Sequence, residues 1–113
     1  MSAVLAQLMA VLEERKSNPP PNSYTARLYS GGVSKIGSKI LEEAQEVVEA
    51  ASEPGDTGRR HLIYESSDLM YHLLVMLAHS GIKLEEVEAE IARRFGQSGL
   101  DEKAARTAAV AAK

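Results

Sequence analysis

Apolar residues recur every three or four positions through most of the chain, and this helical period most constrains what the chain can fold into. The clearest example is the set Ile36, Ile40, Ala44, Val47 and Ala51. The alternation of apolar and polar residues that is typical of a strand does not extend over a useful length anywhere in the sequence. We therefore expect an all-α protein.

Breaks in this period divide the chain into four to five helices. Proline, glycine and serine stand at the breaks, and these residues end helices or turn the backbone. The main predicted helices cover residues 3–17, 33–51, 59–80 and 84–95. We expect a short helical turn and then a flexible bend over residues 22–32. The alanine-rich C-terminal tail is expected to fray after about residue 106.

The third predicted helix is apolar on more than one side. The stripe expected to face the core consists of Leu62, Leu69, Leu73 and Met76. Three more apolar residues lie well off this stripe: Met70, Leu74 and Leu77. A helix buried so broadly needs two neighbours. A single domain over residues 1–113 has few long helices to offer, so the sequence predicts a homodimeric helical bundle.

The composition argues against several classes of function. A net charge of −3 gives no general attraction to nucleic acid. The chain has no cysteine for thiolate metal sites or disulfides. It has no apolar run of about 18 residues that could span a membrane, and its apolar N-terminal segment lacks the basic start of a signal peptide. We therefore expect a cytoplasmic protein with neither a nucleic-acid nor a membrane partner.

Acidic side chains gather from residue 40 onward, at the end of the second predicted helix, and this stretch has no basic residue to neutralise them. Five glutamates lie in the stretch from residue 40 to residue 53: Glu42, Glu43, Glu46, Glu49 and Glu53. Glu43 and Glu46 lie at the border of the apolar stripe, whereas Glu42 and Glu49 point further toward solvent. Glu43 and Glu46 are therefore the candidates for partial burial.

The third predicted helix repeats this arrangement with Glu65 and Asp68. Glu65 lies between Leu62 and Leu69 on the face expected to enter the core, where an unpaired carboxylate is unfavourable. Antiparallel packing of the two helices would bring the two acidic pairs face to face. Four carboxylates at one place need a cation, and oxygen ligands suit Mg²⁺ or, as a substitute, Mn²⁺. Such an ion would recruit a phosphorylated ligand.

Plainer interpretations of these residues stay open. Glu42, Glu49 and Glu53 fit a solvated face better than a ligand role. Lys35 and Lys39 could meet phosphate oxygens, or Lys39 could form an ion pair with Glu43. A di-iron site is disfavoured, because it would require histidine where Asp68 stands.

The three histidines also have plain interpretations. His72 could orient the carboxylate of Asp68, or it could be a core residue. His61 and His79 are expected to be structural.

Two strings together resemble the all-α nucleotide pyrophosphohydrolases, the MazG-like superfamily. They are Lys39-Ile-Leu-Glu42-Glu43-Ala-Gln-Glu46 and Glu65-Ser-Ser-Asp68-Leu69-Met-Tyr71-His72. Two further strings, Ser23-Tyr24-Thr25 and Ser98-Gly99-Leu100-x-Glu102-Lys103-Ala104, are similar to the phosphoribosyl-ATP pyrophosphatase family of histidine biosynthesis. The similarity extends from about the first predicted helix to Arg106.

The resemblance implies a homodimeric enzyme that uses Mg²⁺ to hydrolyse 1-(5-phosphoribosyl)-ATP to 1-(5-phosphoribosyl)-AMP and pyrophosphate. By the family pattern, the metal ligands would be Glu43, Glu46, Glu65 and Asp68. Glu42 would be a further ligand or would position water, and Glu42 and Glu46 are the catalytic candidates. Lys39, Lys35 and Arg27 would bind the substrate triphosphate.

Two other functions remain as alternatives at this stage. The first is a housekeeping pyrophosphatase that removes damaged or surplus nucleoside triphosphates. The second is a helical dimerisation module without catalytic activity, whose acidic face binds a basic partner. A true cation site should raise thermal stability when Mg²⁺ is added, and the module should not respond.

Overall fold

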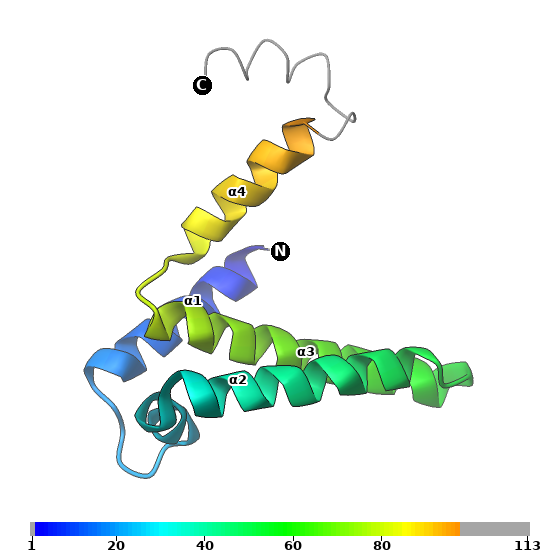
Figure 1. Cartoon of the computed structure of the whole chain (residues 1–113), viewed down its shortest axis with the longest axis horizontal. Helices are drawn as coiled ribbons and strands as arrows, with labels where there is room; N and C mark the ends of the chain where they lie inside the picture. The colour runs from blue at the N-terminus through cyan, green and yellow to red at the C-terminus, as the bar shows by residue number, and fades with distance from the viewer. Residues whose placement is uncertain (1, 98–113) are drawn as a thin grey trace. The chain divides into compact units, whose positions relative to one another are not determined.

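The computed structural model describes residues 2–97, and four α-helices with no strand make up this part of the chain. Their bounds are α1 Ser2–Ser17, α2 Tyr24–Ala51, α3 Gly55–His79 and α4 Leu84–Gln97 (Figure 1). The predicted all-α class is confirmed. The residues up to Ile82 and those from Lys83 onward form two compact units, which are described separately.

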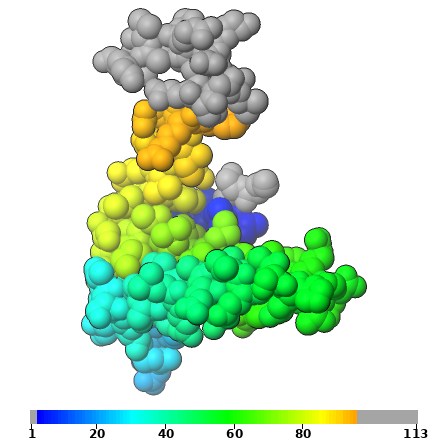
Figure 2. Space-filling view, turned by 45° about the vertical axis from the view of Figure 1, so that its right-hand side comes forward, coloured from blue at the N-terminus to red at the C-terminus, as the bar shows by residue number. Residues whose placement is uncertain are grey.

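The first unit is built on a long antiparallel hairpin of α2 and α3, with α1 packed against both (Figure 1). The largest fully buried apolar side chains come from all three helices: Leu12, Leu28, Ile36 and Val75. Side chains fill the space between α2 and α3, so that Figure 2 shows the hairpin as one continuous surface. This packing fixes which residues of α2 face which residues of α3.

Local sequence explains where α2 begins and bends. Ser23 caps its N-terminus by accepting a hydrogen bond from the Ala26 amide at 2.9 Å. The helix is kinked at Gly32, whose φ of 69° and ψ of −160° are accessible to glycine and unfavourable for other residues. The expected bend is therefore present as a kink. The segment before it, Tyr24 to Gly31, is eight residues of helix rather than a single turn.

The ends of α3 also have local causes. The helix begins at Gly55, so the predicted start after Gly58 is wrong. Gly58 lies inside the helix because the position has no room for a side chain. A Cβ there would sit 2.2 Å from the Glu53 carbonyl oxygen. At the other end, Gly81 adopts a φ of 76° and Ile82 donates to the Leu77 carbonyl at 2.9 Å. This is the predicted glycine cap, in the form of a Schellman motif.

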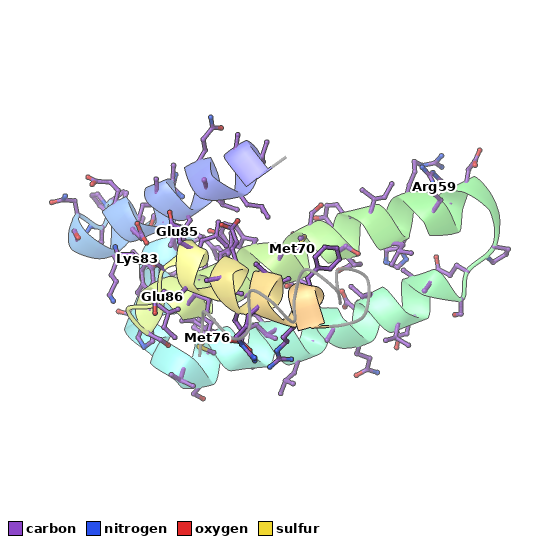
Figure 3. All side chains as sticks on the ribbon, turned by 90° about the horizontal axis from the view of Figure 1, so that it is seen from above. Arg59, Met70, Met76, Lys83, Glu85 and Glu86 are labelled. Carbon is purple, nitrogen blue, oxygen red and sulfur yellow. The ribbon has the colours of Figure 1, made fainter. Side chains whose placement is uncertain are left out.

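The buried face of α3 differs from the predicted stripe. Leu73 is 47% exposed, although the sequence predicts it in the core, whereas Glu65, His72 and Val75 are buried. The large apolar residues that remain exposed on the hairpin include Val33, Leu41, Val48, Ile63 and Met70. Figure 3 shows Met70 midway along α3 and Arg59 near the start of that helix. α2 and α3 therefore bury a partly polar face against each other and leave an apolar face uncovered in the single chain.

The described part of the second unit is α4, an amphipathic helix with acidic residues in its first turn and Arg94 in its last. This charge order favours the helix dipole at both ends. Glu90 pairs with Arg93 at 2.6 Å and with Arg94 at 2.9 Å, so the charge of Glu90 is neutralised within its own helix. Among residues 2–97, no helix has the length and apolar character needed to cross a bilayer.

Candidate functional site

Four carboxylates lie on the facing sides of α2 and α3, and we call Glu43, Glu46, Glu65 and Asp68 the acid cluster. Glu43 is 5% exposed and Glu65 is 8% exposed, and the other two are half-buried. Asp68 lies close enough to Glu43 to raise its pKa, and Glu65 hydrogen-bonds to Glu46. Antiparallel packing thus brings the two acidic pairs opposite each other, Glu43 with Asp68 and Glu46 with Glu65.

The Glu43 carboxylate is held by a histidine of the opposite helix. His72 Nδ1 lies 2.6 Å from Glu43 Oε1, and His72 Nε2 lies 2.6 Å from the Tyr24 hydroxyl. Burial raises the pKa of Glu43 by more than the His72 hydrogen bond lowers it. His72 contacts Asp68 through the backbone carbonyl, at 3.0 Å. Its ring therefore orients Glu43, not the Asp68 carboxylate that the sequence suggests.

The second half of the acid cluster combines two carboxylates with a histidine. The hydrogen bond to Glu65, together with some desolvation, raises the pKa of Glu46, because a negative charge on Glu46 is unfavourable beside a second carboxylate. His61 Nε2 lies 3.3 Å from Glu65 Oε2, and its Nδ1 lies 3.0 Å from Glu53 Oε1. The Glu53 hydrogen bond is the main cause of the raised pKa of His61. His61 thus contacts this half of the cluster and gives Glu65 a hydrogen-bonding or, when protonated, a cationic partner.

The predicted substrate-binding cations lie on α2 and are accessible. Lys39 is half-buried and reaches Glu42 at 3.3 Å, so the ion pair in the structure is with Glu42 and not with Glu43. Lys35 is exposed on the same helix. Arg27 is exposed and donates to the Asn22 carbonyl at 3.0 Å. Glu42 is exposed, as its position on the helix predicts.

Sequence reasoning misses two features of the site. The sequence indicates only a structural role for His61, although this residue precedes Glu65 by four positions, and such spacing brings side chains together on a helix. The contact of Tyr24 with His72 joins residues 48 positions apart and has no local signal. His79 stacks on Tyr29, which agrees with the structural role expected for it. The Ser98–Ala104 string lies outside the described residues.

The donor set suits a hard divalent cation. All four members of the acid cluster offer oxygen ligands, and two of them are buried in a region where like charges face each other. Within residues 2–97, no three acidic or histidine side chains gather around a common point as in a formed metal centre. The chemistry and the placement of the ligands therefore fit a cation, while their side chains are paired with one another and with His61 and His72.

Comparison with known sequences identifies the family of the chain. Residues 5–95 match the sequence model of a family described as phosphoribosyl-ATP pyrophosphohydrolase. The chain belongs to this family. The matched range includes the whole acid cluster, the three candidate substrate-binding cations and both histidines that contact the cluster.

Relatives named phosphoribosyl-ATP pyrophosphatase support the assignment to this family along most of the chain. The protein of Rhodopirellula baltica is 54% identical over 92% of this chain and 87% of its own length. The protein of Methylococcus capsulatus is 47% identical over 91% of this chain and 95% of its own length. A protein of Neisseria meningitidis is 45% identical over 93% of this chain and 95% of its own length. The stretch of chain that defines family membership therefore contains the residues that form the site.

Proposed function

We propose that this chain hydrolyses 1-(5-phosphoribosyl)-ATP to 1-(5-phosphoribosyl)-AMP and pyrophosphate, a step of histidine biosynthesis. The observation that supports this best is the family match over residues 5–95, which contains every member of the acid cluster. The relatives that share this match carry the name of the activity. A biosynthetic role of this kind suits a cytoplasmic location, which we propose with it.

We propose Mg²⁺ as the cofactor, with Mn²⁺ as a substitute. Glu43, Glu46, Glu65 and Asp68 would hold it, since their oxygens are the ligands that hard cations prefer. When bound, the cation would offset charge on phosphate oxygens and lower the pKa of a water molecule. Glu42, exposed beside Glu43, is the residue best placed to accept a proton from water or to serve as a further ligand.

The cations of α2 would bind the triphosphate. Lys39 lies within ion-pair distance of Glu42 and near Glu43, so phosphates held at the acid cluster would come within its reach. Lys35 lies four residues earlier on the same helix and Arg27 lies before the Gly32 kink. In the absence of substrate, Glu42 holds Lys39 by an exposed ion pair of modest strength that a phosphate oxygen can replace.

We further propose that two copies of the chain pair through the exposed apolar face of the α2–α3 hairpin. Leu41 is 73% exposed, and Val48, Ile63 and Met70 are also largely uncovered. An exposed group of large apolar side chains of this kind is typical of an interface. A dimeric mass in analytical ultracentrifugation at micromolar concentration is expected, and a Leu41→Lys variant should sediment as a monomer. A monomeric mass for the unaltered chain would contradict the dimer.

A panel of nucleotides tests the proposed function. Purified protein is offered phosphoribosyl-ATP, ATP and other nucleoside triphosphates with Mg²⁺, and pyrophosphate release is measured. We expect the highest kcat/KM with phosphoribosyl-ATP. Preference for ordinary or damaged nucleoside triphosphates would indicate the housekeeping activity. Absence of pyrophosphate release from every nucleotide would contradict an enzymatic role and favour the dimerisation module.

A further inference from the structure

His72 occupies an unusual position beside the acid cluster. The residue is 4% exposed, and both ring nitrogens have close partners. Nδ1 lies 2.6 Å from Glu43 Oε1 and 3.0 Å from the Asp68 carbonyl oxygen, and Nε2 lies 2.6 Å from the Tyr24 hydroxyl. One imidazole therefore joins a candidate ligand on α2, the backbone of a second candidate on α3, and a tyrosine at the start of α2.

These partners determine which nitrogen carries the proton. A backbone carbonyl can only accept a hydrogen bond, so Nδ1 facing the Asp68 carbonyl must be the donor. The same N–H points at the Glu43 carboxylate. In the neutral ring, Nε2 then has a free lone pair and accepts from the Tyr24 hydroxyl. The order of donors is Tyr24 to His72 and His72 to Glu43.

The kink at Gly32 makes this arrangement possible. Tyr24 and Glu43 belong to the same helix, and 19 residues of straight helix would separate them by about 28 Å at 1.5 Å per residue. Both nevertheless contact the same imidazole ring. The non-helical φ and ψ of Gly32 turn the segment before it back toward α3 (Figure 1). That segment, Tyr24–Gly31, is anchored further by the hydrogen bond between Thr25 Oγ1 and the Tyr71 hydroxyl at 2.7 Å.

We propose that Tyr24 and His72 are positioning residues that fix the Glu43 carboxylate in the orientation needed to bind the cation, an inference that rests on the proposed function. Neither residue is required to touch substrate. Ligands held by a second group of hydrogen bonds lose less freedom on binding a metal, and removing such a group commonly weakens metal affinity or activity by about 10- to 100-fold. We expect the same scale of effect here.

The test compares two tyrosine variants that each lose one hydroxyl. Tyr24→Phe removes the donor to His72, whereas Tyr29→Phe removes a donor to the Leu12 carbonyl at 2.8 Å and leaves the acid cluster untouched. Mg²⁺ affinity is measured by titration calorimetry on the metal-free protein, and the folded state is checked by circular dichroism. We expect about 10-fold weaker Mg²⁺ binding for Tyr24→Phe and unchanged binding for Tyr29→Phe.

Two histidine variants give a second comparison. The side-chain amide in His72→Asn can place a donor near the position of Nδ1, whereas the longer amide in His72→Gln reaches toward the position of Nε2. We expect His72→Asn to retain more Mg²⁺ affinity than His72→Gln. Nitrogen NMR of the metal-free, unaltered protein should show His72 protonated at Nδ1 and hydrogen-bonded as an acceptor at Nε2. The Tyr24→Phe spectrum should lose the signature of the Nε2 hydrogen bond.

Equal Mg²⁺ affinity in Tyr24→Phe, Tyr29→Phe and unaltered protein would overturn the proposal, as would a His72 ring protonated only at Nε2. These readouts use no nucleotide. If Mg²⁺ binding responds as expected but phosphoribosyl-ATP is not cleaved, the positioning role stands and the proposed substrate fails. If phosphoribosyl-ATP is cleaved and the variants bind Mg²⁺ equally well, the proposed function stands and the positioning role fails.

Discussion

Glutamates have opposite environments in the α2–α3 hairpin and in α4. Glu90 of α4 is exposed and contacts two arginines on its own helix, which lower its pKa to about 2. Glu43 of α2 is buried, and burial raises its pKa although His72 lies beside it. The charge of Glu90 is neutralised within one turn of sequence. The acid cluster has no arginine pairs of this kind, and its geometry depends on the packing of two helices.

This difference separates acidic residues that support a helix from those that can perform chemistry. A carboxylate with its own arginines gains nothing from a metal ion. Facing carboxylates that contact one another and neighbouring histidines can exchange those partners for a cation. Variants that change one environment and leave the other intact test this contrast between the acid cluster and α4.

Removing one charge from the acid cluster should nearly abolish turnover. We expect Glu46→Gln and Asp68→Asn each to lower kcat by about a thousandfold, because a bound metal contributes several kcal/mol to catalysis of this kind. Glu90→Gln in α4 should keep kcat within a factor of about two, because surface substitutions away from a site have small effects. Pyrophosphate release at saturating Mg²⁺ measures all three. Near-normal turnover in Glu46→Gln or Asp68→Asn would exclude a ligand role for that residue.

Replacing Gly32 should lower the stability of the hairpin more than replacing Gly37 does. Gly32→Ala is expected to destabilise the fold by about 1–3 kcal/mol, since its φ and ψ are strained for any residue with a Cβ. Gly37→Ala is the matched control, because its Cβ would lie 3.8 Å from Met76 Cε, in ordinary contact. Urea unfolding compares the two variants. Equal stability of Gly32→Ala and the unaltered chain would contradict the role given to the kink.

Repulsion between Glu46 and Glu65 should lower the thermal stability of the metal-free protein. In the presence of a chelator at neutral pH, Glu46→Gln should raise Tm by a few degrees, because the amide can donate to Glu65 without adding charge. Glu90→Gln should lower Tm slightly, because it weakens the pairs with Arg93 and Arg94. Differential scanning calorimetry would detect both. A lower Tm for Glu46→Gln would show that the Glu46–Glu65 contact is not repulsive.

The two environments should also respond oppositely to pH. The folded-state pKa of Glu90 is about 2, below its usual value of 4.5. The stabilisation from ionised Glu90 is therefore complete above pH 4.5 and is lost as the pH falls toward 2. The pKa of Glu43 is raised, so protonation of Glu43 favours the fold and this effect is lost as pH rises through its folded pKa. Carboxyl carbon NMR of the metal-free protein should place the two midpoints on opposite sides of 4.5. Equal titration midpoints for Glu43 and Glu90 would contradict the difference between their environments.

Much of this organisation can be predicted from sequence, because it is local. The periodicity places all four helices, and the apolar neighbours Leu62 and Leu69 identify Glu65 as a buried carboxylate. Capping residues predict the end of α3 shortly before Gly81. The start of α3 cannot be placed in this way, because a glycine that normally ends a helix, Gly58, is here packed against the Glu53 carbonyl inside it.

The rest depends on tertiary register, which no local pattern reveals. The apolar pattern predicts Leu73 in the core, yet α3 is rotated so that Glu65, His72 and Val75 face inward. The contact between Tyr24 and His72 requires both that rotation and the backbone turn at Gly32. The sequence can therefore identify the ligand candidates, while the residues that hold them in place require the three-dimensional structure.

The most direct test of the central claim is the effect of Mg²⁺ on thermal unfolding. At Mg²⁺ concentrations about 100 times Kd, binding to the folded state alone stabilises it by about 2.7 kcal/mol. Unaltered protein and Glu90→Gln should show this rise in Tm, and Glu65→Gln and Asp68→Asn should not. A Tm that does not change with Mg²⁺ in the unaltered protein, or that rises equally in all four proteins, would contradict a cation site at the acid cluster.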